Sequence, residues 1–264
     1  ITYNGDMDLS IIDELPKNRP EIHTSYIEKD NLSTAFNFIR EKVEDGGQTI
    51  IVYPLINESE KQDLSAAVES YEYLRDNIFP DIKVGLMHGK LDDENKNNEM
   101  QSFMKGDIDI LVSTTVVEVG IDNPNVNVML INNSERFGLS QLHQLRGRVG
   151  RGTLESYCLL CSDSESPTTK ERLSIIVNSR NGFEIADEDL KLRGPGEFFG
   201  EKQSGFVKFK IADLITDGPI IRNARMNAFE IIKNDANLTQ NNHLMIKQKF
   251  DDEYLQLFLK TTVN

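Results

Sequence analysis

Apolar residues in the first two thirds of the chain switch repeatedly between helical and strand spacing. From Leu32 to Val43 they recur every three or four positions, which predicts an amphipathic helix that ends before Gly46-Gly47. The run TIIVY that follows, ending at Pro54, is continuously apolar and predicts a buried strand. Similar short runs predict strands in KVGLM, IDILVST, NVMLIN and YCLLC, with helical segments between most of them.

This alternation of strands and helices predicts an α/β fold. Because most of the five predicted strands are fully apolar rather than apolar on alternate positions, we expect a parallel sheet with helices on both faces. Ligands of such sheets bind at the carboxyl ends of the strands. The chemistry is therefore expected just after Met87, Thr114 and Ile131.

The pattern changes after Pro167. Residues 171–178 and 183–192 have helical spacing and are joined by the turn Asn181-Gly182, which predicts a helical hairpin. The stretch LRGPGEFFGEKQSG then carries four glycines and is interpreted as a loop, followed by more helix. We expect a connecting arm over residues 1–29, a sheet domain over 30–165, and the hairpin, loop and C-terminal helices over 166–264.

The charge of the chain argues at first against a nucleic-acid ligand. The net charge is −14 over 264 residues, and 38% of the residues are hydrophobic. However, the segment from Arg136 to Leu154 contains no acidic residue and four arginines, which are Arg136, Arg146, Arg148 and Arg151. A basic segment within an acidic chain indicates a focused anion site; the alternative is a helix face balanced by acidic residues elsewhere.

Other features narrow the class of protein. Cys158 and Cys161 lie in an apolar run without a second ligand pair, so we expect inert core cysteines rather than a zinc site. The chain starts with Ile rather than Met, which indicates a piece of a longer protein. No apolar run is long enough to span a membrane and no leader pattern is present, so a reducing cytoplasm is the expected location.

A complete nucleotide site is not expected in this chain. A phosphate-binding loop needs glycines followed by Lys and then Ser or Thr, whereas Gly89-Lys90 is followed by Leu91. The acidic pairs Asp92-Asp93, Asp187-Glu188 and Asp251-Asp252 lie on helical or loop patterns rather than after an apolar strand. The four histidines are scattered, and no nucleophile–base constellation is indicated.

Two segments do indicate chemistry on phosphates. In QLHQLRGRVGRG, Arg148 and Arg151 are three residues apart, which on a helical turn would place them on one side, and glycines keep the backbone beside them thin. Arginine suits bidentate phosphate contact, and such a residue at a phosphoryl-transfer site is worth roughly 10³ to 10⁵ in rate. In STTVVEVGIDNPN a strand ends in hydroxyl residues, Gly120 permits close approach, and Asp122 could accept from a ribose hydroxyl.

These two segments resemble motifs V and VI of superfamily 2 helicases, whose pattern Q-x-x-G-R-x-G-R is matched here from Gln144 to Arg151. The longer strings ERFGLSQLHQLRGRVGRG and NGFEIADEDLKLRGPGEFFGEKQSG resemble the RecG-type branched-DNA helicases, although Asn181 stands where that family usually has Asp. The resemblance covers essentially the whole chain. It implies the second RecA-like motor domain followed by a translocation hairpin.

The resemblance also implies residue roles. Arg151 would be an arginine finger, with Arg148 also near the γ-phosphate. The nucleotide site would further include Gln144, Gly120 and Asp122, and the DNA track would include His88, Gly89, Thr114 and Thr115. The hairpin and the following loop would couple hydrolysis to movement through Arg172, Arg193, Gln203, Ser204 and Gly205.

The implied cofactors are ATP and Mg²⁺, both held mainly by a first motor domain outside this chain. The implied partners are forks and Holliday junctions in DNA repair and recombination, the wedge and first motor domains of the same protein, and no membrane, in a monomer. On this interpretation the chain alone hydrolyses no ATP. Two alternatives stay open: a transcription–repair coupling translocase, against which Pro195 argues, and a non-catalytic DNA- or protein-binding module, against which Arg148 and Arg151 argue.

Overall fold

The computed structural model describes residues 20–54, 60–114, 123–198 and 217–253. The chain divides into two compact units, with the boundary between Asp189 and Leu190. The first unit contains the sheet and the helices that cover it. The second contains the C-terminal helices, and each unit is described here by itself.

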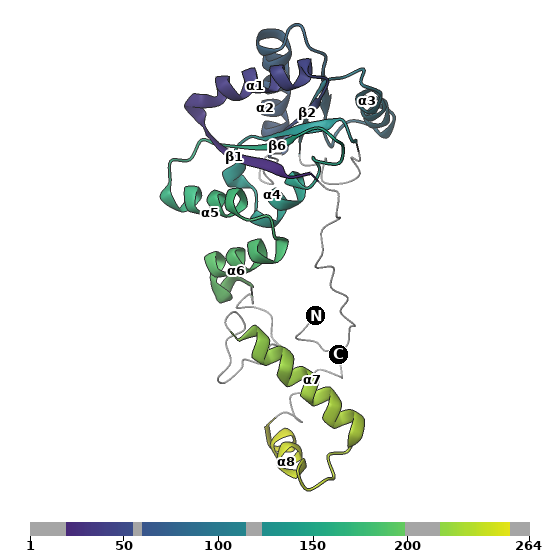
Figure 1. The fold of residues 1–264 in the computed structure, drawn as a ribbon, viewed down its shortest axis with the longest axis vertical. Coiled ribbons are helices and arrows are strands. Elements are labelled where there is room, and N and C mark those ends of the chain that lie inside the picture. Colours follow the sequence, from purple (N-terminus) through teal and green to yellow (C-terminus); the bar gives the residue numbers. More distant parts are fainter. Residues whose placement is uncertain (1–19, 55–59, 115–122, 199–216, 254–264) are drawn as a thin grey trace. The chain divides into compact units, whose positions relative to one another are not determined.

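A six-stranded sheet forms the centre of the first unit, and every pair of neighbouring strands is parallel. The strand order is β1-β6-β5-β2-β4-β3, and Figure 1 shows β1 beside β6. The strands are β1 (Ile22–Glu28), β2 (Gln48–Tyr53), β3 (Val84–Met87), β4 (Ile110–Thr114), β5 (Val126–Ile131) and β6 (Ser156–Ser162). The inner strands β4 and β5 are buried along their whole length, as their mostly apolar sequences predict.

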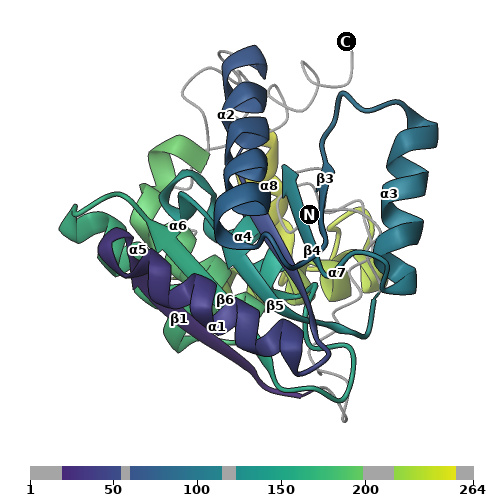
Figure 2. The same cartoon turned by 90° about the horizontal axis from the view of Figure 1, so that it is seen from above.

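One face of the sheet is covered by α1 (Leu32–Glu44) and α2 (Glu60–Tyr73), the latter continuing as a π-helical turn over Leu74–Ile78 (Figures 1 and 2). Their apolar side chains pack on the sheet residues that point to this side. Fully buried members of this cluster are Ile39, Leu74, Phe79, Ile51, Ile110 and Val112.

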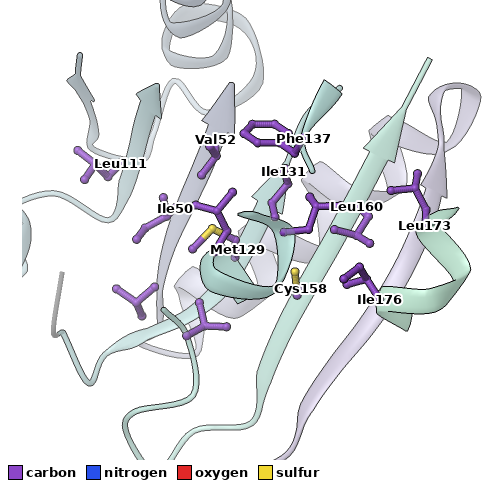
Figure 3. Packing of buried hydrophobic residues seen from close by; sticks show 14 of the residues in the cluster. Ile50, Val52, Leu111, Met129, Ile131, Phe137, Cys158, Leu160, Leu173 and Ile176 are labelled. Atoms are coloured by element: carbon purple, nitrogen blue, oxygen red, sulfur yellow. The ribbon is translucent and has the colours of Figure 1, made fainter. Parts of the chain in front are cut away.

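The other face is covered by α3 (Asp93–Lys105), α4 (Leu139–Arg146) and α5 (Pro167–Asn178). Figure 3 shows the core on this side, where Leu173 and Ile176 of α5 approach Leu160 and Cys158 of β6. The thiols of Cys158 and Cys161 are free and buried, and burial raises the pKa of each to about 12. The prediction of unreactive core cysteines agrees with this environment.

Local sequence signals explain where the elements begin and end. The Asp92 carboxylate accepts a hydrogen bond of 2.8 Å from the Asn95 amide and starts α3. Gly106 ends the same helix with φ of 80°, a left-handed conformation that glycine adopts without strain. Asn181, which stands in place of the family's usual Asp, accepts from the Phe183 amide at 2.9 Å and so supports the start of α6 (Gly182–Phe198).

Three expectations differ from the structure. Residues 1–29 were expected to be a connecting arm, yet Ile22–Glu28 forms the edge strand β1, paired with β6. The strand escapes periodicity analysis because an edge strand is only half buried and two prolines precede it. The helix α5 was assigned to a separate C-terminal region, but its Leu173 and Ile176 belong to the core of the sheet unit. Finally, α6 continues to Phe198, through glycines that were interpreted as loop.

In the second unit, α7 (Gly218–Asn234) and α8 (Leu244–Glu253) are joined by a turn built around Asp235. Its carboxylate accepts from the Gln240 amide at 2.8 Å and the Thr239 amide at 2.9 Å, and lies 2.9 Å from His243 Nδ1. These bonds, the one from Gln240 first, hold the pKa of Asp235 well below its usual range. No helix among the described residues is long and apolar enough to cross a membrane.

Candidate nucleotide and DNA sites

The arginine motif lies at the amino edge of the sheet. After β5 the chain turns at its carboxyl end, and α4 returns it to the edge where β6 begins at Ser156. A Cβ added to Gly150 would lie 3.1 Å from the Ile22 side chain and 3.6 Å from Ser156 Cβ, so this glycine sits beside the first residues of β1 and β6. We refer to residues Gly147–Gly152, which follow α4, as the arginine loop.

Three features fix the path of the arginine loop. The Val149 side chain is fully buried in the core cluster and anchors the loop between its two arginines. Gly150 has φ of 74° and reverses the backbone where other residues would be strained. A Cβ on Gly152 would lie 2.1 Å from the Pro124 carbonyl oxygen, so only glycine fits there. The loop is thus held against the segment that precedes β5.

The two arginines do not occupy a helical turn, contrary to the sequence interpretation. The helix α4 ends at Arg146, and the left-handed Gly150 together with the inward Val149 prevents its continuation. Within the loop, Arg148 is half-buried and Arg151 is exposed. Gln144 is exposed on the last turn of α4. All three side chains therefore lie near the amino edge, the opposite edge from the one on which chemistry was expected.

Arg146 has a different role from the other arginines of the basic segment. Its guanidinium is 4% exposed and donates to the Ile176 carbonyl at 2.6 Å and the Ser179 carbonyl at 2.8 Å, at the C-terminal end of α5. The same group lies 2.9 Å from His143 Nδ1. Because α-helices leave their last carbonyls unpaired, Arg146 acts as a side-chain cap of α5 rather than as an exposed anion ligand.

The predicted DNA residues lie at the carboxyl edge. The register pairs Met87 of β3 with Ser113 of β4. His88 comes directly after Met87 and Thr114 directly after Ser113, so both lie at this edge. His88 is half-buried, and its pKa is lowered by burial and by the nearby Lys90 and Lys96. Gly89 is exposed beside it. The strands span the distance between the two edges, and β5 has six residues at about 3.3 Å each. The carboxyl edge is therefore about 20 Å from the amino edge, where the arginine loop lies.

Thr114 differs from the expectation in its exposure. Its side chain is fully buried, and within the described parts of the chain its hydroxyl oxygen has no hydrogen-bond partner, nor does the buried His88 Nδ1. Buried polar atoms in proteins are usually paired. The three predicted residues Thr115, Gly120 and Asp122 lie outside the described residues.

A buried polar network, which the sequence did not indicate, fixes the end of the segment that carries Asp122. Gln48 Nε2 donates to the carbonyls of Phe103 and Ile108, each at 2.7 Å. Asn123 Nδ2 donates to Gln48 Oε1 at 2.9 Å, and both side chains are almost completely buried. The network connects the end of α3 with the residue after Asp122. Its only sequence signal is a glutamine at the start of an otherwise apolar strand.

Of the residues expected to couple hydrolysis to movement, Arg172 is the best described. It lies half-buried on α5 and donates to the backbone carbonyl of Glu135, in the turn that follows β5. Its Nε atom and Glu135 Oε2 have no hydrogen-bond partner among the described residues. Arg193 falls on the part of α6 whose side chains are not described, and Gln203, Ser204 and Gly205 lie outside the described residues.

Two family models match the chain. The model described as helicase conserved C-terminal domain matches residues 30–153. The model described as ATP-dependent DNA helicase RecG, domain 3, C-terminal, matches residues 179–264. Curated relatives named ATP-dependent DNA helicase RecG are 51% identical in Thermotoga maritima over 88% of this chain and 47% identical in Bacillus subtilis over 89%. A solved structure of RecG bound to a three-way DNA junction matches 79% of this chain at 49% identity, with a TM-score of 0.62.

The chain belongs to the RecG family. This confirms the resemblance inferred from motif VI and from the string LRGPGEFFG, and it confirms the RecA-like α/β fold. The chain spans 30% of the Thermotoga RecG and 35% of the Bacillus RecG, and 26% of the RecG in the junction complex. The arginine loop falls within the helicase model, and α6 falls within the RecG-specific one.

Proposed function

We propose that this chain is the second motor half of an ATP-dependent branched-DNA helicase that reverses forks and processes Holliday junctions. The observation that carries the proposal is the separation of two sets of residues by the sheet. Arg148, Arg151 and Gln144 lie at the amino edge, whereas His88 and Thr114 lie at the carboxyl edge. Two ligands could therefore be bound at the same time, which a motor requires of ATP and DNA.

At the amino edge, the arginines would contact the phosphates of ATP bound by a first motor domain outside this chain. ATP would supply the free energy of phosphoryl transfer, and the arginines would stabilise charge developing on the transferred group. Among the described residues no group of three or more His, Cys, Asp or Glu side chains could hold a metal ion. We propose, independently of this, that Mg²⁺ is held mainly by that other domain together with ATP.

At the carboxyl edge, the imidazole of His88 and the amide of Gly89 would contact the DNA backbone. The hydroxyl of Thr114 lies buried at the end of β4 and would have to become exposed before it could contact DNA. Contacts of this kind position a protein on DNA without reading its sequence. The net charge of −14 is compatible with this local site if the basic surface that holds most of the DNA belongs to other domains.

Coupling between the edges would pass through the hairpin. Arg172 ties α5 to the turn after β5, so a shift of the arginine loop and α4 would be transmitted to α5. We propose that Arg193, Gln203, Ser204 and Gly205 continue this path to the DNA.

The test compares Arg151→Ala with Arg75→Ala in the full-length protein. Arg75 is an exposed arginine in the turn after α2, paired with Asp76, and so controls for the loss of one surface charge. We expect Arg151→Ala to lower DNA-stimulated ATP turnover by roughly 10³-fold or more, with DNA binding retained, and Arg75→Ala to change neither. ATP turnover that is unaffected by Arg151→Ala would refute the assignment of the amino edge to the nucleotide.

The DNA substrate is tested with a synthetic fork beside a blunt duplex of equal length. ATP-dependent strand separation on the fork alone supports a branched-DNA helicase. ATP hydrolysis without strand separation on either substrate would instead favour a translocase with the same motor residues.

A further inference from the structure

The side chain of His143 links three elements that the proposed mechanism moves together. It lies on the last turn of α4, three residues before Arg146, and its Nδ1 atom is 2.9 Å from Arg146 Nη2. The Arg146 guanidinium in turn donates to the Ile176 and Ser179 carbonyls at the end of α5. On the other side of the ring, a Cβ added to Gly182 at the start of α6 would lie 3.0 Å from His143 Nε2.

The chemistry of this contact fixes the state of the imidazole. A guanidinium carries five N–H donors and has no acceptor, so the short contact requires a lone pair on His143 Nδ1. The proton of the neutral ring must then be on Nε2. A protonated imidazole has N–H groups at both nitrogens, so it cannot accept this bond and would place a second positive charge against Arg146.

We propose that His143 is a positioning residue: its Nδ1 lone pair holds the Arg146 guanidinium on the C-terminal carbonyls of α5, and protonation of the ring releases this clamp. The inference rests on the proposed function, because the clamp connects the arginine loop, which starts at the next residue, Gly147, to the α5–α6 turn. While the clamp is closed, α4 and the hairpin move as one body. Once it opens, ATP hydrolysis continues but movement of the hairpin no longer follows it.

Protons can reach the ring from solvent. A cavity of about 210 Å³ lies beside it and is lined by His143, Arg146, Gly147 and Arg180, with Glu21 from the segment before β1. The charged groups around the ring therefore come from several elements. They are Arg146 on α4, the Arg180–Glu21 ion pair from the α5–α6 turn and the segment before β1, and Glu184 on α6, which accepts from Ser179 Oγ.

Three variants of the full-length protein separate the clamp from a merely structural histidine. His143→Asn places a non-titrating amide oxygen near the position of Nδ1 and should keep the clamp closed at every pH. His143→Phe retains a planar ring without an acceptor and should leave the clamp open at every pH. His23→Phe is the matched control, since His23 lies on β1 beside the Tyr157 ring and takes no part in the clamp.

The first measurement is amide hydrogen exchange of the segment 172–185, expressed as protection factors at pH 8 and pH 5. We expect protection in the wild type to fall about tenfold on acidification, the change for loss of one hydrogen bond to a charged group. Asparagine at position 143 should keep high protection at both pH values, and phenylalanine should give low protection at both. Wild-type protection and wild-type pH response in His143→Phe would overturn the clamp.

The second measurement is the ratio of fork unwinding to ATP hydrolysis over the same pH range. This ratio should fall with acidification in the wild type and in His23→Phe, and should be independent of pH in His143→Asn. A pH dependence in His143→Asn equal to that of the wild type would refute the role of the ring. If the protein unwinds no substrate at any pH, the proposed function fails, whereas hydrogen exchange still decides whether the clamp exists.

Discussion

Replacement of Gly152 by alanine should disable the motor while leaving the sheet folded. The new Cβ would lie 2.1 Å from the Pro124 carbonyl oxygen, whereas carbon–oxygen contacts are normally about 3.3 Å or longer. Either the arginine loop or the segment just after Asp122 must therefore move by about 1 Å, and a displacement of that size costs about 10²-fold at a reacting centre. The assay is DNA-stimulated ATP turnover by the full-length protein, for which we expect a loss of about 10²-fold.

The matched control is Gly46→Ala. Unlike Gly152, Gly46 has a positive φ, 88°, but a Cβ there would meet nothing within 4 Å, so the change adds backbone strain without a clash. The strain should lower stability by roughly 1 kcal/mol and leave ATP turnover unchanged. Far-ultraviolet circular dichroism of both variants checks that the fold is retained. Wild-type turnover by a folded Gly152→Ala protein would refute the inference that this contact sets the position of the arginines.

Two further predictions concern stability and are measured by urea unfolding of the chain. Leu145→Ala removes a fully buried side chain of α4 and should cost about 2–5 kcal/mol, whereas Gln144→Ala, on the exposed side of the same turn, should change stability by less than about 0.5 kcal/mol. The pKa of Asp92 is lowered, chiefly by the Asn95 amide, so its contribution is present above the unfolded pKa and is lost as pH falls through the folded pKa. The stability difference between the wild type and Asp92→Asn should therefore shrink with acidification below about pH 4, and a constant difference would contradict the capping role.

The order of the inner strands and helices could be predicted because burial on both faces of the sheet produces a simple pattern of apolar residues in the sequence. A strand such as β5 is apolar at nearly every position, Asn127 being the exception, and helices such as α4 repeat their apolar residues at 3.6-residue spacing. The edge strand β1 has no such pattern, since its side chains are only half-buried or exposed. The placement of α5 outside the sheet unit had a different cause. Leu173 and Ile176 show that this helix is amphipathic, but the sequence does not show which surface it covers.

The roles of the candidate residues stay predictions, but the structure shows where these residues lie. Motif spacing singled out Arg148 and Arg151, whereas the rule that ligands lie at the carboxyl ends of parallel strands gave no indication that these arginines lie at the amino edge. Spacing also treated Arg146 as equivalent to its neighbours, although its guanidinium is buried on carbonyls more than thirty residues away in the sequence. Such long-range contacts have no local pattern, and the Gln48–Asn123 network was missed for the same reason.

Under the proposed function, the arrangement of the two edges limits how ATP hydrolysis would be transmitted to DNA. The edges are about 20 Å apart and connected by fully buried strands, which do not slide within a close-packed core. A signal must therefore pass around the sheet rather than through it. The helix α4 runs between the edges, and two arginines attach α5 to the segments on either end of α4. Arg146 connects α5 to the start of the arginine loop, and Arg172 connects it to the turn after β5. A helix held at both edges by arginine–carbonyl hydrogen bonds can shift when either edge moves. This makes α5 the best candidate for the element that transmits movement between the two edges.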